Sequence, residues 1–432
     1  MIDKKKVLLI SYYWPPSGGS GVQRWVKFCK YLPDFEIEPI VLTVENGTYP
    51  LTDSTLEEEV SPNLKVYKSK SIEPYSLFGK ILGQSANQVS TPSTAFSDNG
   101  NILKKFGVWV RANFFIPDAR IGWIPFTVKK ASEIIYKHNI ETIITTGPPN
   151  STHLIGLKLV KKNPKLNWIM DMRDPWTQIF YNQDLPRHSF ASKKDLELEK
   201  KALKHADEVI LVSKSVQDIQ KKIYDRGYQI VTNGFDHTEF SVTSESNRKD
   251  ILSIKYIGSM TESAIPYNFF NALKKLDKKL QKRVKIDFIG SINSKVTEII
   301  RSQDLNHIVH FSKYLPHLEA KNEMQTSDVL LLTIPNTKNS NAITPGKIFD
   351  YIGAHKPILC IGPNNGDAAK IITEYNLGYN FGYDDQVTLK AKLEELIKSD
   401  VSSYNTWSSD LKDHPFSRYS LTKKLSQILN QY

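Results

Sequence analysis

The chain has little cysteine and no long apolar run. Cys29 and Cys360 are the only cysteines among 432 residues. So few thiols, so far apart in the sequence, predict neither a disulfide framework nor a cysteine metal site, and they favour a reducing cytoplasm. No run approaches the roughly 20 apolar residues that a spanning helix needs, so we expect any membrane contact to be peripheral. The run from Val7 to Ile10 is short and lacks a cleavage site, which predicts a strand and not a signal peptide.

The sequence also lacks the motifs of several ligand-binding classes. It has no zinc-finger or RNP-type spacing and no tail of like charge, so nucleic acid is a weak prediction despite the net charge of +11. The glycine-rich stretch from Ser17 to Gly21 has neither GxGxxG spacing nor a Walker Lys-Ser/Thr pair, which disfavours a dinucleotide or P-loop site. The basic excess still predicts attraction to an anionic partner such as a nucleotide or a phospholipid surface.

What the sequence does contain is an alternation of short apolar runs with amphipathic stretches. Its length exceeds what one hydrophobic core normally supports. Alternating strand and helix patterns predict parallel sheets, so we expect an α/β protein of two Rossmann-like, doubly wound domains. A polar linker predicts domains over 1–240 and 241–405, followed by an amphipathic segment within 406–432. Residues 45–105 lose regular periodicity and predict a long, partly mobile insertion.

The stretch from Thr344 to Pro357 carries the strongest chemical signal. It lies between two apolar runs and predicts a loop followed by a helix, with Thr344 as the N-cap. The helix start at Gly346, with Lys347 one turn in, would attract phosphate. Asp350 falls on the same helical face, where its carboxylate could accept from vicinal hydroxyls. The stretch therefore predicts a nucleotide site, and an ordinary capped helix with a solvated Lys and a surface Asp is the alternative.

Polar and glycine residues follow three predicted strands in the first half of the chain. In an open α/β sheet ligands lie beyond the carboxyl ends of the strands, so we expect these residues to line one crevice. The carboxylate of Asp174 could accept or orient the proton of an acceptor hydroxyl. An ion pair of Arg173 with Asp171 or Asp174 that braces the loop is the alternative. For the glycines, the alternative is a flexible loop that needs only small residues. The candidates at these strand exits are Gly18, Gly19, Asn150, His153, Asp171, Arg173, Asp174 and Trp176.

Two of these stretches resemble a known enzyme family. The segment PGKIFDYIGAHKPIL resembles the nucleotide-sugar-binding segment of GT-B fold glycosyltransferases, especially the family 4 type. The pattern TGPPNSTHLIG…WIMDMRDPW is similar to bacterial family 4 enzymes of surface-polysaccharide clusters. The resemblance implies two domains facing a cleft and a C-terminal helix that returns toward the first domain, with a plain C-terminal cap as the alternative. It also implies a cytoplasmic transferase that uses a nucleotide sugar, a glycan or lipid-linked saccharide acceptor, no cofactor and no metal.

The resemblance also implies roles for individual residues. Asp350 would hold the donor ribose, and Lys347 would stabilise the leaving diphosphate. Lys347, Asp174 and Arg173 would form the catalytic set. The remaining donor-binding residues would be Gly18, Gly19, Gly258, Ser259, Thr261, Gly290, Thr344 and Gly346, and the acceptor side would hold Asn150, His153, Asp171, Arg173, Asp174 and Trp176.

The sequence departs from the family at four places, one of which is Asp350, where the family usually has the longer Glu. The Arg and Lys that usually follow the first glycine turn have no match between Ser259 and Pro266, and Ala342 stands where the family has an acid. Many members place a His near the position of Gly147, and His153 cannot be assumed to replace it. Two alternatives stay open: a nucleotide-sugar epimerase of the GT-B fold, which would need no acceptor site, and a catalytically silent binding partner, which the missing basic pair favours.

Aromatic residues interleaved with Lys and Arg flank the expected insertion. They occur from Tyr75 to Lys80 and from Lys104 to Phe115. Such a pattern can lie at a bilayer interface, with the rings in the headgroup layer and the charges on anionic lipid. We therefore predict a peripheral contact of the 75–115 region with the inner face of the cell membrane, and core packing under a loop is the alternative.

Overall fold

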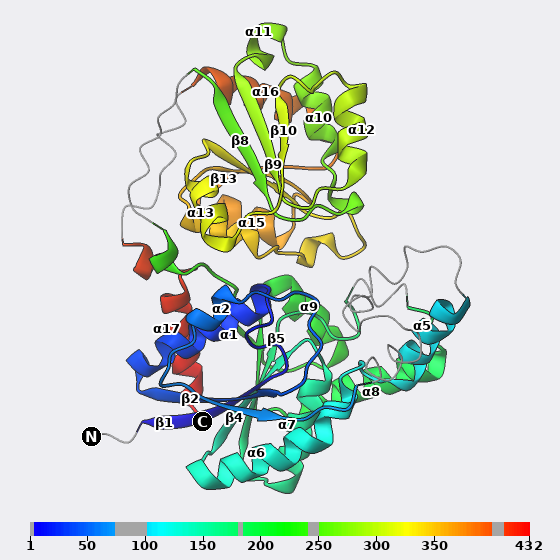
Figure 1. Ribbon diagram of the computed structural model, residues 1–432, viewed down its shortest axis with the longest axis vertical. Coiled ribbons are helices and arrows are strands. Elements are labelled where there is room, and N and C mark those ends of the chain that lie inside the picture. Colours follow the sequence, from blue (N-terminus) through cyan, green and yellow to red (C-terminus); the bar gives the residue numbers. More distant parts are fainter. Residues whose placement is uncertain (1–3, 74–101, 180–184, 241–249, 400–409) are drawn as a thin grey trace. The chain divides into compact units, whose positions relative to one another are not determined.

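The computed structural model describes residues 4–73, 102–179, 185–240, 250–399 and 410–432, without the side chains of 102–105. The predicted aromatic flank at 75–80 lies outside the described residues, as do residues 74–101 of the expected insertion and most of the expected linker. The chain divides into two compact units (Figure 1). Unit 1 comprises Met1–Thr232 and Leu421–Tyr432, and unit 2 comprises Asn233–Ser420. The sequence predicted these limits at residues 240 and 405, whereas the units divide after Thr232 and after Ser420.

Unit 1 is built on a parallel sheet whose order, within the described residues, is β3-β2-β1-β4-β5-β6-β7. The strand patterns are those of buried parallel strands, with near-continuous apolar runs in the centre of the sheet. Every pairing between neighbours is parallel. The strands are β1 (Lys5–Ser11), β2 (Ile37–Val44), β3 (Lys65–Ser69), β4 (Thr142–Gly147), β5 (Asn167–Met172), β6 (Glu208–Leu211) and β7 (Gln229–Ile230).

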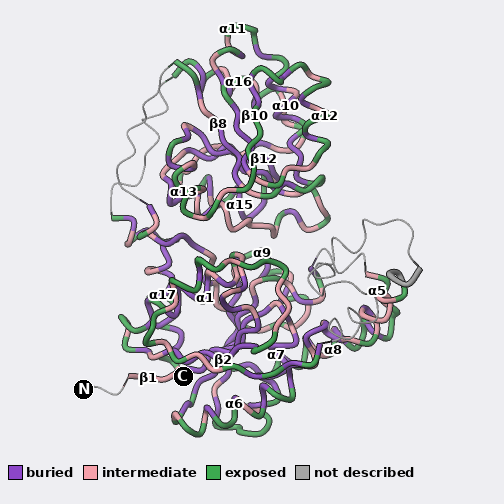
Figure 2. The backbone as a smooth tube through the Cα atoms, in the orientation of Figure 1, coloured by how far each residue is buried: buried purple, intermediate pink, exposed green. Residues whose placement is uncertain are grey.

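The helices of unit 1 cover this sheet and bury its central strands (Figure 2). The C-terminal helix belongs here, because Leu421, Leu425 and Ile428 pack into the same core as Val7 and Val41. The helices are α1 (Ser20–Tyr31), α2 (Thr55–Glu58), α5 (Ile102–Phe114), α6 (Ile124–His138), α7 (Ser151–Lys162), α8 (Ser189–His205), α9 (Lys214–Ile223) and α17 (Arg418–Leu429).

Unit 2 repeats the architecture with the described order β10-β9-β8-β11-β12-β13, again with parallel pairings. Its strands are β8 (Leu252–Ile257), β9 (Val284–Ile289), β10 (Val309–Ser312), β11 (Val329–Thr333), β12 (Ile358–Ile361) and β13 (Gly378–Phe381). Its helices are α10 (Tyr267–Lys274), α11 (Lys278–Gln281), α12 (Ser294–Ser302), α13 (His317–Gln325), α14 (Lys347–Gly353), α15 (Asp367–Glu374) and α16 (Gln386–Lys398).

The structure corrects the expectation that residues 45–105 form one irregular insertion. Strand β3 lies within that range and pairs with β2 along its length. Its sequence KVYKS is short and polar because it lies at the edge of the sheet, where only one strand neighbours it. Strand β13, at the other sheet's edge, is likewise polar and was not predicted.

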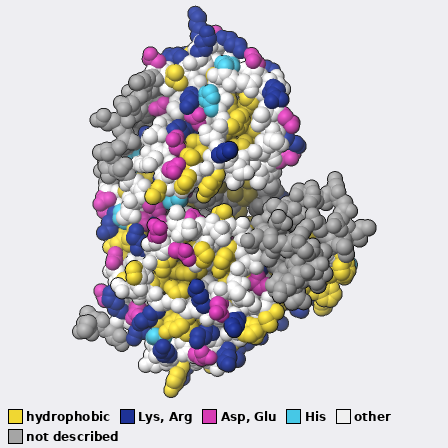
Figure 3. Space-filling model, viewed as in Figure 1, with side chains coloured by type: hydrophobic (Ala, Val, Ile, Leu, Met, Phe, Trp, Pro, Cys, Tyr) yellow, Lys and Arg dark blue, Asp and Glu magenta, His cyan; other side chains and the backbone are white. Residues whose placement is uncertain are grey.

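Helix α5 carries large exposed side chains. Phe106 is 58% exposed and Phe114 is 67% exposed. The ring of Trp109 lies between them, 5.9 Å from that of Phe106 and 5.8 Å from that of Phe114. Hydrophobic side chains reach the surface in this part of unit 1, near the right edge of Figure 3. None of the described helices combines the length and the apolar character needed to cross a membrane.

Candidate active site

Each sheet has one place where its strand order reverses direction. In unit 1 it lies between β1 and β4, and in unit 2 between β8 and β11. Ligands of open α/β sheets bind beyond the strand ends at such switch points. Gly18, Gly19, Asn150, Gly258 and Lys347 follow these four strands, so these predicted residues fall at the two switch points, while Arg173, Asp174 and Gly290 follow the neighbouring strands β5 and β9.

Lys347 is the central cation of the unit 2 switch point. Its Nζ donates to Tyr256 Oη at 2.8 Å and lies 4.0 Å from the centre of the tyrosine ring. Burial lowers the pKa of Lys347 to about 8, against an attraction from Asp350 that raises it. Among the described residues no carboxylate lies within ion-pair distance of this ammonium. A partly buried ammonium that contacts only neutral groups can still bind an anion, because its charge is not neutralised.

The predicted glycine turns of unit 2 meet beside Lys347. Gly258 has φ +121°, and a Cβ on it would lie 3.0 Å from Lys347 Nζ. Gly290 has φ +126°, and a Cβ there would lie 2.6 Å from the Gly258 carbonyl oxygen. Glycine is therefore needed at position 258, where the Lys347 ammonium lies close to the backbone, and at position 290, where the Gly258 backbone does. Ser259 and Thr261 follow the first turn with exposed side chains, and the Ser259 carbonyl accepts from Tyr256 Oη at 2.7 Å.

The helix start differs from the prediction. Helix α14 begins at Lys347 with Gly346 as its N-cap and no side-chain cap. Thr344, predicted as the cap, has a buried hydroxyl without a hydrogen-bond partner in the described part of the chain. The reason is that Pro345 and Gly346 separate the threonine from the first helical residue, which leaves its oxygen out of reach of the helix amides.

Asp350 is held by a lysine that the sequence did not indicate. Lys321 Nζ donates to Asp350 Oδ1 and lies 3.2 Å from Glu239 Oε2. Lys321 is 2% exposed, whereas the side chain of Asp350 is 25% exposed. The carboxylate predicted to bind ribose is thus accessible on one side and anchored on the other.

In unit 1, the glycines bring the start of α1 close to Arg173. Gly19 is the N-cap of α1 with φ +104°, a conformation that favours glycine. Gly18 donates its N–H to the Leu51 carbonyl oxygen at 2.9 Å. A Cβ on Gly21 would lie 1.2 Å from Arg173 Nη1, so only glycine admits the guanidinium there. Each of these glycines therefore has a specific contact or backbone conformation. A flexible loop that needed only small residues, which was the alternative, would not require them.

Arg173 is bound by carbonyl groups and not by a carboxylate. Its Nε donates to the Gly147 carbonyl oxygen at 3.0 Å and its Nη2 to that of Pro148 at 2.5 Å. Burial lowers the pKa of Arg173, and the nearby Asp171 and Asp174 raise it. Neither carboxylate is within ion-pair distance in the described structure, so the proposed bracing ion pair is wrong.

Asp171 has a different partner. Its carboxylate is fully buried and accepts from Arg24 Nη2 at 2.9 Å, Trp25 Nε1 at 2.7 Å and Thr146 Oγ1 at 2.8 Å. Arg24 is the largest single cause that holds the pKa of Asp171 below its usual value against desolvation. Asp171 therefore joins α1 to β4 and β5, whereas Asp174 is exposed.

His153 reaches the space beside Gly147 from within α7. A Cβ on Gly147 would lie 2.4 Å from His153 Nε2. The ring is fully buried, its Nδ1 lies 2.9 Å from Thr145 Oγ1, and Nε2 has no hydrogen-bond partner in the described residues. Burial lowers the pKa of His153 to about 3, so the ring is neutral near pH 7. The side chain of His153 thus occupies the volume that a side chain at position 147 would need.

The two remaining acceptor candidates differ in exposure, since Asn150 is partly exposed and Trp176 is buried. Asn150 precedes α7 without capping it, because Asp118 accepts from the Ser151 N–H at 2.8 Å instead. Trp176 is fully buried, and its Nε1 donates to Asp195 Oδ1 at 2.8 Å. We therefore leave Trp176 out of the proposed acceptor contacts.

Sequence reasoning missed Tyr256, Lys321 and Arg24. Tyr256 lies in β8 two residues before Gly258, and its inward position follows from strand alternation once the turn is known. Lys321 and Arg24 gave no signal, since each lies on an amphipathic helix among other charged residues.

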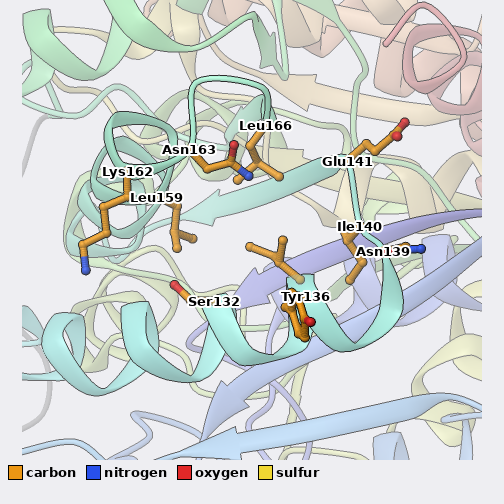
Figure 4. A pocket seen from close by; sticks show the side chains of 10 residues that line it. Ser132, Tyr136, Asn139, Ile140, Glu141, Leu159, Lys162, Asn163 and Leu166 are labelled. Atoms are coloured by element: carbon orange, nitrogen blue, oxygen red, sulfur yellow. The ribbon is translucent and has the colours of Figure 1, made fainter.

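A pocket of about 520 Å³ lies away from these residues, at the opposite ends of the unit 1 strands (Figure 4). It is lined by the C-terminal turns of α6 and α7, with Tyr136 and Lys162 among the lining side chains, and by Glu141 before β4. It contains none of the predicted residues. Within the described ranges no group of three or more His, Cys, Asp or Glu side chains could hold a metal ion, and metal independence stays a prediction.

No protein-family model and no curated protein matches the chain. Solved structures do match it. HepE of Anabaena in complex with UDP has a TM-score of 0.65 and 13% identity, over 99% of this chain and 100% of that chain. Sucrose-phosphate synthase from Thermosynechococcus elongatus has a TM-score of 0.63 and 11% identity, over 99% of both chains. WaaG, a glycosyltransferase involved in lipopolysaccharide biosynthesis, has a TM-score of 0.57 and 13% identity, over 99% and 100%. The expected fold is thus confirmed: the chain has the two Rossmann-like parallel-sheet units of the GT-B glycosyltransferases.

Proposed function

We propose that the protein is a glycosyltransferase that moves a sugar from a nucleotide-sugar donor to a glycan or lipid-linked saccharide. The pathway we propose is the synthesis of a bacterial surface polysaccharide or glycoconjugate. The fold supports this proposal, since HepE was solved with UDP and WaaG acts in lipopolysaccharide biosynthesis. The observation that carries the proposal is the position of Lys347 at the unit 2 switch point.

Lys347 combines three properties that suit a diphosphate site. It is positive, it is partly buried, and neutral groups hold it against the Gly258 turn. Charges in such positions are normally paired, so an anionic ligand would complete the arrangement. In the proposed reaction the bond from the sugar to the diphosphate breaks and negative charge develops on the leaving oxygen. Lys347 would stabilise that charge, and a preorganised charge is typically the largest catalytic contribution.

The donor's ribose would meet Asp350, three residues beyond Lys347 on α14. Ser259, Thr261 and Gly290 border the same place through the turns that follow β8 and β9. Gly346 and Thr344 precede the helix, and the unpartnered Thr344 hydroxyl offers a further polar contact.

The acceptor would bind at the unit 1 switch point. Asp174 is exposed beside Arg173, so its carboxylate is free to accept or orient a hydroxyl proton. Arg173 presents a guanidinium with no carboxylate partner in the described structure, which suits a phosphate group of either substrate. Asn150 is partly exposed at the same strand ends, whereas the ring of His153 is fully buried and would support the Gly147 loop without touching the acceptor.

The first experiment is a panel of nucleoside diphosphates and nucleotide sugars, measured by thermal shift and then calorimetry. We expect one base to bind, and Lys347→Ala to weaken its binding. Donor consumption is then measured with and without saccharide acceptors, and with EDTA, which should change nothing because we propose no metal. Acceptor-dependent consumption supports transfer. Epimerisation without an acceptor would favour an epimerase, and the absence of any turnover would favour a silent binding partner.

We also propose a peripheral contact with the inner face of an anionic membrane through α5. This helix has no acidic residue, and it displays Phe106, Trp109 and Phe114 beside Arg111. Rings of this kind lie in the headgroup layer, and basic side chains bind anionic lipid. Flotation with vesicles of phosphatidylglycerol and of phosphatidylcholine tests this contact. We expect binding to the first only, reduced severalfold by Phe106→Ser with Phe114→Ser, and equal binding to both would contradict it.

A further inference from the structure

Lys321 forms the back of the site proposed for the donor ribose. It extends from α13, and its ammonium bonds both Asp350 of α14 and Glu239. The ammonium also lies 4.6 Å from the centre of the Phe240 ring. Glu239 in turn lies 3.3 Å from His317 Nε2, on the first residue of α13. One buried lysine thus links two carboxylates that belong to separate segments of unit 2.

Lys321 and Asp350 differ in how far their side chains are exposed, and this difference indicates their roles. The side chain of Lys321 is 3% exposed, and that of Asp350 is 25% exposed. A ligand can therefore reach the carboxylate and cannot reach the ammonium. Any effect of Lys321 on a ligand must pass through Asp350, which makes it a positioning residue.

The lysine fixes the direction of the carboxylate. Oδ1 of Asp350 is the atom that accepts from Lys321, which leaves Oδ2 for a ligand hydroxyl. A charge-assisted hydrogen bond of this kind restricts rotation of the aspartate side chain, and a shorter acid than glutamate has less reach to correct a wrong angle. Helix α14 also packs closely on two aromatic rings, because a Cβ on Gly353 would lie 2.5 Å from the Phe240 ring and 2.9 Å from that of Phe235.

We infer that Lys321 positions Asp350 to accept from the vicinal hydroxyls of a ribose, and so makes the site select ribonucleotides over deoxyribonucleotides. This inference rests on the proposed function, since it assumes that a nucleoside diphosphate is the ligand. With the carboxylate held at one oxygen, the loss of a ribose hydroxyl leaves a charged acceptor unsatisfied. Such a loss weakens binding by roughly tenfold or more.

The test measures binding of UDP, GDP and ADP against dUDP, dGDP and dADP by calorimetry with the full-length protein. For the base that binds, we expect the wild type to prefer the ribose form by roughly tenfold. In Lys321→Met that preference should fall to within about twofold, mainly because the ribose form binds more weakly, while kcat stays within about threefold.

Lys255→Met is the matched control. Lys255 is a buried lysine of the same unit that bonds Glu323 and Thr326, away from Asp350. Its substitution should leave the ribose preference unchanged. If Lys321→Met does not fold, Lys321→Met with Glu239→Gln removes the acid that would otherwise lose one of its partners, and the same ratio is measured.

Two results would overturn the inference alone. One is an unchanged ribose preference in a folded Lys321 variant, and the other is tighter binding of the ribose form, which would mean that the ammonium competes with the ligand. A wild type that binds none of the six nucleotides would overturn the proposed function as well.

Discussion

Each unit holds two cations near its switch point, one paired and one not. In unit 1, Arg24 is 1% exposed and bonds Asp171, whereas Arg173 is partly buried and, among the described residues, bonds only carbonyls. In unit 2, Lys321 is 2% exposed and bonds two carboxylates, whereas Lys347 is partly buried and bonds only a tyrosine in the part of the chain that the structure describes. The comparison separates cations that hold the fold from cations that are available to a ligand.

The unpaired cations also differ from one another. Carbonyl dipoles hold Arg173, and an aromatic face holds Lys347. A guanidinium keeps its proton at any pH a protein tolerates, whereas the pKa of Lys347 is about 8. Only the unit 2 site should therefore respond to mild alkali.

The largest expected effect concerns stability and separates the two arginines. Arg24→Ala leaves the carboxylate of Asp171 buried and unpaired, which should lower the free energy of unfolding by about 3–5 kcal/mol. Arg173→Ala removes bonds to neutral carbonyls and should cost less than about 1.5 kcal/mol. Urea unfolding of both variants measures the two changes in the free energy of unfolding. Equal losses would contradict the view that Arg24 stabilises the fold and Arg173 does not.

The second prediction concerns turnover. Lys347→Ala should reduce kcat by roughly a hundredfold or more, because a preorganised charge at the leaving group is lost. Its thermal unfolding should stay close to the wild type. Lys370→Ala, at an exposed lysine of the adjacent helix α15, is the control and should keep full activity. Unchanged turnover in Lys347→Ala would exclude it from the site.

The third prediction uses the contact between Gly21 and Arg173. Gly21→Ala puts a methyl group where Nη1 now lies, so the guanidinium must move. We expect turnover to fall by about tenfold, as in Arg173→Ala, with no further loss when the two are combined. Gly227→Ala is the control, because a Cβ there meets nothing within 4 Å. Additive losses would mean that Gly21 acts independently of Arg173.

The sequence predicted the parallel sheets and most of the central elements. Apolar runs and helical periodicity mark the inner strands clearly, while β3 and β13 at the edges are short and polar and gave no such signal. The family resemblance implied that Gly258 and Lys347 belong to one donor site, and the structure places Lys347 Nζ beside Gly258.

The pairing of charges could not be predicted. Asp171 had Arg173 two residues away, yet it bonds Arg24 in α1, which is distant in the sequence. Likewise Asp350 bonds Lys321 on another helix. The cation that pairs with a carboxylate depends on the directions of side chains on helices and strands that pack together. Residue spacing along the chain does not give these directions.

The smallest expected effect is the pH dependence that should distinguish Lys347 from Arg173. Burial lowers the pKa of Lys347 to about 8, so its charged fraction falls as pH rises through 8, and a diphosphate loses its partner. Calorimetry between pH 7 and 9 should show the Kd of the nucleoside diphosphate rising severalfold, by at most about tenfold per pH unit. Lys347→Arg should flatten this profile, since a guanidinium keeps its charge. A wild-type profile that is flat to pH 9 would exclude Lys347 as a titrating phosphate contact, and a variant profile as steep as the wild type's would assign the titration to another group.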